Sequence, residues 1–377
     1  MSEKTVPPKA DAETRQILAE ETASYSAARV RRRRLVPKAA LVGAGAGLVG
    51  VLFRWSLEWA ELARDWMVVH APGFIPLLVV GCMVSVWLVR RFAPEASGSG
   101  IPHLKAVMYG VRELVGQRVL PVKFLGGVLG IGAGMALGRE GPTTQMGGSV
   151  GQMLAERMGV NTQERLTLIA AGAGAGLTAA FNAPIAGTVF VLEEIQRDFT
   201  PGVFVATMVA TVIADMVTRV LSGQVAVIPI NIYPTPPLAS VVPFLVLGAM
   251  AGVLGVAYNR GLEFCVDRFP RLGRYGAVLV GVVVALSAWK APELVGGGHH
   301  VLNEVFVAPM GAGMLIGVWV FRYVLTMISY GCGAPGGIFA PLLVLGSLLG
   351  LGVGQATHWL VPGLQVDPPV YAVVGMA

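Results

Sequence analysis

Apolar segments of membrane-spanning or near-spanning length recur along most of this chain of 377 residues. Only 13% of the residues are charged, whereas soluble proteins carry about a quarter. A hydrocarbon core about 30 Å thick accepts helices because helices satisfy their own backbone hydrogen bonds. The pattern therefore predicts an all-α polytopic membrane protein. Many of the apolar segments are short or interrupted by glycine and proline, which indicates tilted and broken helices.

The first 37 residues differ from the rest, because they are polar and end in the basic side chains Arg31–Arg34. Positive charges beside a membrane segment favour the cytoplasmic side. We interpret residues 1–37 as the cytoplasmic N-terminal arm of a multi-pass protein of the cell (inner) membrane. The apolar run Ala39–Leu57 then crosses, and Phe74–Val89 returns to Arg90–Arg91 on the same side. This anchoring accounts for much of the net charge of +6, so nucleic-acid binding is not expected.

Sequence signals for cofactors, metals and catalysis are weak. The three cysteines have no CxxC spacing, and the adjacent His299 and His300 would point to different faces of a helix. Gly45–Gly50 formally fits the GxGxxG pattern, but it starts a membrane helix instead of following a strand. Glycines in such a helix let neighbouring helices approach closely. No HExxH motif or convincing Ser-His pair is present. We expect no enzyme activity, no cofactor and no metal site.

One spaced set of proline and glycine residues occurs twice, 199 residues apart. Its members are Pro142, Gly147 and Gly151 in the first copy and Pro341, Gly346 and Gly350 in the second. Paired halves with broken helices in corresponding places are typical of transporters built from inverted repeats, which bind substrate where the half-helices meet. The spacing therefore predicts two inverted-topology membrane repeats, residues 38–222 and residues 236–377.

The second repeat is expected to be incomplete. Val373–Ala377 resembles the start of the segment Gly172–Gly187 of the first repeat and then stops. A spanning helix begun near Pro369 would be too short to cross the hydrocarbon core. This predicts a truncated second repeat.

Three loops containing glycine and proline each precede an apolar helix: Gly98–Pro102, Gly138–Pro142 and Gly336–Pro341. Proline in the first turn with glycine before it exposes helix N–H groups, and the positive end of the helix dipole attracts anions. Glu140 lies just before a helix predicted to start at Pro142. Because an ionisable residue at membrane depth usually marks an ion or proton path, we interpret Glu140 as a gate that mimics a transported anion. The alternative is a helix-capping glutamate in a loop.

The same three loops resemble the three signature sequences of the CLC family of chloride channels and chloride/proton antiporters. The resemblance covers Gly-Ser-Gly-Ile-Pro at 98–102, Gly-Arg-Glu-Gly-Pro at 138–142 and Gly-Ile-Phe-Ala-Pro at 337–341, in the same order and with similar spacing. It extends from about residue 38 to the C-terminus. The chain is similar to a prokaryotic, exchanger-like member. The resemblance implies a homodimer in the lipid bilayer, with chloride and protons as its substrates.

The resemblance also implies roles for individual residues. Ser99 corresponds to the serine whose hydroxyl contacts the central anion, and Ile338 and Phe339 correspond to positions whose backbone N–H groups complete that site. Glu140 corresponds to the external gating glutamate, which competes with the anion and carries protons. The other implied anion-site residues are Gly100, Arg139 and Gly141. Serine at position 99, where nitrate-preferring relatives have proline, favours chloride.

Glu194, at the end of the run Val191–Glu194, corresponds to the internal proton-transfer glutamate of the exchangers. Channels of the family typically lack a carboxylate there, so Glu194 favours chloride/proton antiport over a passive chloride channel. For one of Glu193 and Glu194 the alternative is a solvated helix end, because adjacent residues cannot share a helix face. The last helices and the tyrosine of the family's anion site would lie beyond Ala377. A transport-incompetent fragment is therefore a further alternative.

Overall fold

The computed structural model describes residues 12–377 except 198, 225–232, 308–309 and 365, so residues 1–11 of the predicted arm lie outside it. Within the described ranges the regular elements are helical. The one β-type pairing found there is an isolated antiparallel bridge between Gly138 and Gly337. The prediction of an all-α polytopic fold is confirmed.

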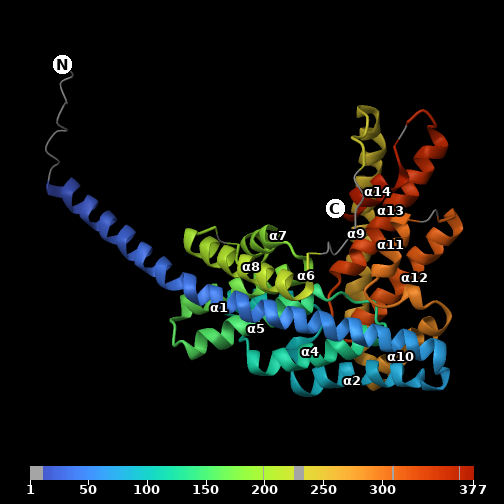
Figure 1. The fold of residues 1–377 in the computed structure, drawn as a ribbon, viewed down its shortest axis with the longest axis horizontal. Helices are drawn as coiled ribbons and strands as arrows, with labels where there is room; N and C mark the ends of the chain where they lie inside the picture. Colours follow the sequence, from blue (N-terminus) through green and yellow to red (C-terminus); the bar gives the residue numbers. More distant parts are fainter. Residues whose placement is uncertain (1–11, 198, 225–232, 308–309, 365) are drawn as a thin grey trace.

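The N-terminal helix is longer than the sequence indicated. α1 runs from Ala12 to His70 and passes through Pro37 without ending. Figure 1 shows its first part projecting away from the other helices. Residues 12–37 of the predicted arm are therefore helical and continuous with the first membrane segment.

The first half of the chain combines long helices with short ones. After α1 come η1 (Pro72–Phe74), α2 (Pro76–Phe92), η2 (Pro94–Ala96), α3 (Ile101–Met108), α4 (Gly116–Ala133), α5 (Glu140–Arg157), α6 (Thr162–Phe181), α7 (Pro184–Phe190), the π-helical turn η3 (Val191–Ile195) and α8 (Pro201–Ser222). The first two predicted glycine-containing loops fall between α2 and α3 and between α4 and α5.

The second half repeats this order of elements. It contains η4 (Leu238–Ser240), α9 (Val241–Arg268), η5 (Phe269–Leu272), α10 (Arg274–Lys290), η6 (Pro292–Leu294), α11 (His299–Val307), α12 (Ala312–Gly331), α13 (Phe339–Leu360) and α14 (Pro368–Met376). The series α10, η6, α11, α12, α13, α14 corresponds to α2, η2, α3, α4, α5, α6. The last pair differs in length, because α14 has 9 residues and α6 has 20.

The two halves are related as inverted repeats at the point where they meet. Gly138 and Gly337 are equivalent residues, and the backbone N–H of each donates to the carbonyl of the other over 2.7 Å. An antiparallel pair of equivalent residues is what a two-fold axis between repeats produces. In Figure 1, α9 and α13 of the second half stand steeply against α1, α2 and α4 of the first half.

Five helical segments of the described chain are long and apolar enough to cross a membrane: Arg34–His70, Pro201–Ser222, Leu238–Leu272, Ala312–Gly331 and Phe339–Leu360. Between them lie helices that are too short to cross alone. α3, α7 and α11 have 8, 7 and 9 residues. The structure therefore has the broken helices that the interrupted apolar segments predicted.

The repeated glycines allow two pairs of helices to pack backbone against backbone. A Cβ atom at Gly151 of α5 would lie 2.8 Å from the carbonyl carbon of Leu168 in α6. A Cβ atom at Gly350 of α13 would lie 2.8 Å from the Cα atom of Ala372 in α14. Small residues permit such close approaches between membrane helices. The glycines whose spacing reveals the repeat in the sequence are thus the residues at which α5 packs on α6 and α13 packs on α14.

The change Gly151→Ala is expected to destabilise the protein, because the added methyl group collides with the backbone of α6. Overpacking of this kind costs about 1–3 kcal/mol, and a lower thermal unfolding midpoint in detergent would measure it. The matched control is Gly252→Ala in α9, where no atom lies within 4 Å of the added Cβ. Equal midpoints for the two variants would contradict the packing argument.

Candidate functional site

The first turns of α3, α5 and α13 form the candidate site, and all three helices begin inside the loops that were expected to precede them. α5 begins at Glu140 and not at Pro142, which occupies the third position of the helix. N–H groups of a first turn have no partner within the helix, so proline is tolerated throughout that turn. Glu140 is therefore the first helical residue and not a loop residue before the helix.

Backbone hydrogen bonds hold the three loops together. The N–H of Gly98 donates to Ala334 over 3.1 Å, and the N–H of Gly336 donates back to Gly98 over 3.0 Å. The Gly138–Gly337 pair joins the loops before α5 and α13 in the same manner. Each loop is thus paired with a loop of the opposite half, so the starts of α3, α5 and α13 converge.

Glycine is required where the second loop touches the first loop and the third loop. A Cβ atom at Gly141 would lie 2.8 Å from the Cα atom of Ser99. A Cβ atom at Gly337 would lie 3.0 Å from the backbone nitrogen of Gly141. Any side chain at Gly141 would push the start of α5 away from the start of α3.

A cavity of about 1020 Å³ opens at this meeting point. Its wall includes the predicted site residues Ser99, Glu140, Gly141, Glu194, Ile338 and Phe339. Gly100 and Arg139 are not on this wall. Gly100 precedes α3 in the left-handed region at φ 80° and packs against Gln145. The Arg139 guanidinium instead donates to the carbonyl of Ala180 over 3.5 Å.

Glu140 is buried, with 3% of its surface exposed. Its side chain folds back over Gly138, where a Cβ atom would collide with the carboxylate. The carboxylate lies near the backbone N–H groups of Glu140 itself and of Ala340, in the first turn of α13. The second carboxylate oxygen, Oε2, is buried without a partner. A negative group therefore occupies the positive end of α13.

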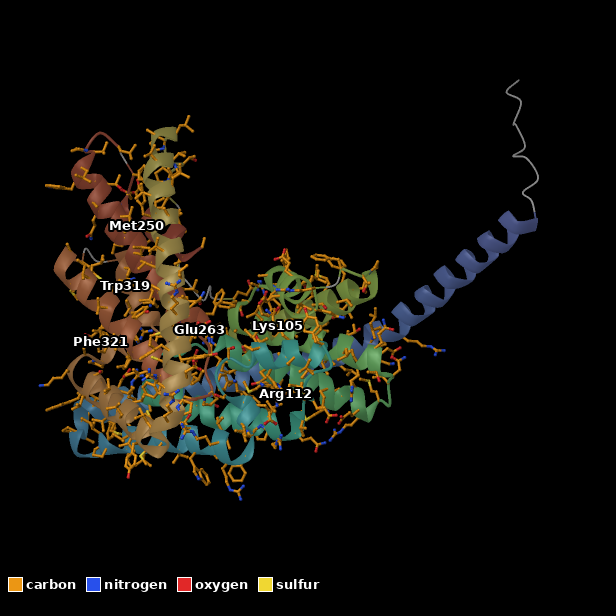
Figure 2. The ribbon with its side chains drawn as sticks, turned by 180° about the vertical axis from the view of Figure 1, so that it is seen from behind. Lys105, Arg112, Met250, Glu263, Trp319 and Phe321 are labelled. Carbon is orange, nitrogen blue, oxygen red and sulfur yellow. The ribbon has the colours of Figure 1, made fainter. Side chains whose placement is uncertain are left out.

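Glu194 lies on η3, on the same cavity wall as Glu140, and its side chain is 44% exposed. It forms an ion pair with Lys105 of α3. Figure 2 shows Lys105 among the helices of the first half. The neighbouring Glu193 is exposed and not on the cavity wall. Of the two adjacent glutamates, Glu193 is thus the one at a solvated surface.

Two buried cations near the loops were missed from the sequence. Lys123 of α4 is 0% exposed, and its Nζ donates to the carbonyls of Ala96 and Gly98 over 2.9 and 2.6 Å. Arg322 of α12, its equivalent 199 residues later, is also 0% exposed. Its Nη1 donates to the carbonyls of Leu294 and Gly296 over 3.0 and 2.9 Å. The signal was available as a charged residue at the same place in two apolar segments.

The described residues contain no group of three or more histidine, cysteine, aspartate or glutamate side chains that could hold a metal ion. The polar groups on the cavity wall are backbone N–H groups, hydroxyls, carboxylates, the Asn182 and Gln224 amides, and the charged groups of Lys105 and Arg219. Such an arrangement can bind a small anion and move a proton.

Comparison with known proteins supports this interpretation. Residues 81–377 match the model of the family described as voltage gated chloride channel. The chain is 41% identical over 354 residues to the H(+)/Cl(-) exchange transporter ClcA of Vibrio cholerae, a match covering 89% of this chain and 76% of the relative. It is 38% identical over 393 residues to ClcA of Klebsiella pneumoniae, covering 94% of this chain and 83% of the relative.

Solved structures agree with these matches. The structure of a slow cyanobacterial Cl-/H+ antiporter superimposes with a TM-score of 0.86 at 36% identity, covering 91% of this chain and 84% of the other. A eukaryotic CLC transporter has the same fold, with a TM-score of 0.77 at 23% identity, covering 91% of this chain and 64% of the other. Fold and converging helix starts define a membrane transport protein of inverted repeats. The chain belongs to the voltage-gated chloride channel (CLC) family, which confirms the resemblance seen in its three loops.

The role of the buried cations can be tested at Arg322, where the other repeat supplies the control. Arg322→Met should lower the thermal unfolding midpoint in detergent, because the carbonyls of Leu294 and Gly296 lose a buried donor. Each unsatisfied carbonyl costs about 1–3 kcal/mol. Arg322→Lys should retain most of the stability, because lysine is the residue at the equivalent position of α4, Lys123. Equal losses in the two variants would contradict this role.

Proposed function

We propose that this protein exchanges chloride for protons across the cell membrane. The observation that carries the proposal is the position of the Glu140 carboxylate, which lies at the start of α13 in the same cavity as Ser99 and Glu194. A carboxylate in an anion's place links proton binding to anion binding. The relatives named as H(+)/Cl(-) exchange transporters support the same activity.

Chloride would bind at the convergence of the helix starts without a full positive charge on the protein at that point. An anion leaves water only if N–H and O–H dipoles replace part of its hydration, and binding must stay weak enough for release. The Ser99 hydroxyl and the backbone N–H groups of Ile338 and Phe339 would supply these dipoles. Each helix start adds the equivalent of about half a positive charge.

The other proposed anion-site residues would act next to this point. Gly141 allows the start of α5 to touch Ser99, and the left-handed Gly100 sets the direction of α3. Arg139 lies beside Glu140 without reaching the cavity wall, so it would add positive potential from behind the site.

Glu140 would act as the gate and as the first proton carrier. When ionised, its carboxylate competes with chloride for the N–H groups of α13. When protonated, it loses that attraction and leaves the place to the anion. Glu194 would pass protons between the cavity and the side on which Lys105 lies. Because one cavity is lined by both glutamates, water inside it could connect them.

The surroundings of the protein follow from its family and its apolar helices. We propose a multi-pass protein of the inner membrane with a cytoplasmic N-terminus, as the basic cluster before the first membrane segment favours. A homodimer is proposed as well, as the family resemblance implies. Its substrates would be chloride and protons alone, with no cofactor and no catalysed reaction.

Liposomes carrying the protein test the activity directly. A chloride gradient should drive protons uphill, measured with a pH-sensitive dye alongside a chloride electrode. Chloride movement without any proton movement would identify a passive channel instead.

Glu140→Gln should preserve chloride flux and abolish proton coupling, because a neutral amide can neither carry the proton nor compete as an anion. The same paired measurement reads both quantities in one sample. Proton movement equal to that of the unmodified protein would rule out Glu140 as the gate.

Glu194→Gln should also lose proton coupling while chloride still moves, since the amide cannot exchange protons with the cavity. The control is Glu193→Gln, which removes the adjacent solvated carboxylate and should leave coupling unchanged. If both variants pump protons equally well, the internal relay lies elsewhere.

A further inference from the structure

A tyrosine at the end of α12 reaches the anion cavity from the second half of the chain. The Tyr330 hydroxyl oxygen lies 3.4 Å from the backbone nitrogen of Ser99 and accepts its N–H. A Cβ atom at Gly98 would lie 2.7 Å from this hydroxyl. The absence of a side chain at Gly98, which has a φ of 60°, therefore lets the phenol approach. Tyr330 lines the same cavity as Ser99 and Glu140.

The hydrogen of this hydroxyl is available to a ligand. A phenol can both accept and donate a hydrogen bond. Among the described residues, the bond found at Tyr330 is the one it accepts from Ser99, and no bond that it donates is found. The N–H that it accepts polarises the O–H and makes it a better donor. The Ser99 hydroxyl oxygen likewise accepts the N–H of Ile101 over 3.3 Å, which leaves its hydrogen available too.

Tyr330 also lies at the boundary of a second cavity. This cavity has about 830 Å³ and shares Tyr330 and Pro102 with the first one. Its wall carries side chains of both charges, namely Arg112 and Arg118 with Glu95 and Glu113, together with His103. Arg118 forms an ion pair with Glu95. The phenol therefore stands between the space that contains Ser99 and a second space with a polar wall.

The hydroxyl is a feature of one half only. Lys123 and Arg322 fix the correspondence between α4 and α12, and by that correspondence the equivalent of Tyr330 is Ile131, which is buried and apolar. The architecture of the repeat thus does not require a hydroxyl here. The hydroxyl is present only in the second half, where that of Tyr330 accepts the N–H of Ser99.

We propose that Tyr330 is an anion ligand whose O–H donates to chloride bound beside Ser99, so that the phenol forms the boundary of the site toward the second cavity. This inference rests on the proposed function, because it takes chloride as the ligand. Tyr330 is distinct from the tyrosine of a final helix that the family resemblance implies. The pair of O–H donors would contact the anion from one side, and the N–H groups of α13 from another.

Tyr330→Phe removes this hydroxyl alone and keeps the ring that packs against Gly98. Chloride binding to the full chain in detergent, measured by titration calorimetry, should weaken by at least about tenfold, since a hydrogen bond to a charged group contributes a factor of roughly 10 to 100. The control is Tyr323→Phe on the same helix, whose hydroxyl donates to Ala257 over 3.0 Å and does not line the cavity. Tyr323→Phe should bind chloride like the unmodified protein.

Unchanged chloride affinity in Tyr330→Phe, or an equal loss in Tyr323→Phe, would overturn the assignment of Tyr330. A second measurement needs no variant: crystals soaked in bromide should show an anomalous peak within hydrogen-bond distance of the Tyr330 hydroxyl, and a bromide at Ser99 out of its reach would overturn it. Failure of the proposed function looks different, because the unmodified protein would then bind no chloride or move no protons.

Discussion

Breaking a helix inside an apolar body exposes backbone N–H and carbonyl groups, and these groups must find partners within the protein. In this structure the two halves satisfy each other. Gly138 pairs with Gly337, and Gly98 bonds to Ala334 and Gly336. Carbonyls that remain receive buried cations, Lys123 in one half and Arg322 in the other. The broken helices are therefore fixed in place by a symmetric set of bonds.

The proposed function depends on the backbone N–H groups that this pairing leaves without a partner. First-turn N–H groups of three helices have no partner within their helices, and the bonds between the loops bring these three helix starts to one cavity. Fixed dipoles of this kind attract an anion without the cost of burying an unpaired charge. The protein supplies an anion of its own in Glu140, whose carboxylate can gain or lose a proton. If the Glu140 carboxylate and an anion compete for one binding place, proton binding to Glu140 is coupled to anion binding.

Much of this arrangement could be predicted from the sequence, because glycine and proline have local effects that do not depend on the rest of the fold. Their spacing predicted the repeat and the three loops, and the structure places Ser99, Glu140 and Ile338 on one cavity wall. The start of α5 was predicted two residues late, since proline is tolerated throughout a first turn. Lys123 was missed although a charged residue at the same place in two apolar segments marks it, and Tyr330 was missed because its partner is far along the chain. Ser99 and Tyr330 are 231 residues apart, and no local pattern encodes such a contact.

The central claim is that chloride and the Glu140 carboxylate compete for the same N–H groups, and proton uptake on chloride binding tests it most directly. Chloride is added to the detergent-solubilised protein in weakly buffered solution while the pH is recorded. Displacement of the carboxylate should be accompanied by its protonation, so the pH should rise for the unmodified protein and stay constant for Glu140→Gln. Chloride binding to the unmodified protein without proton uptake would contradict the competition.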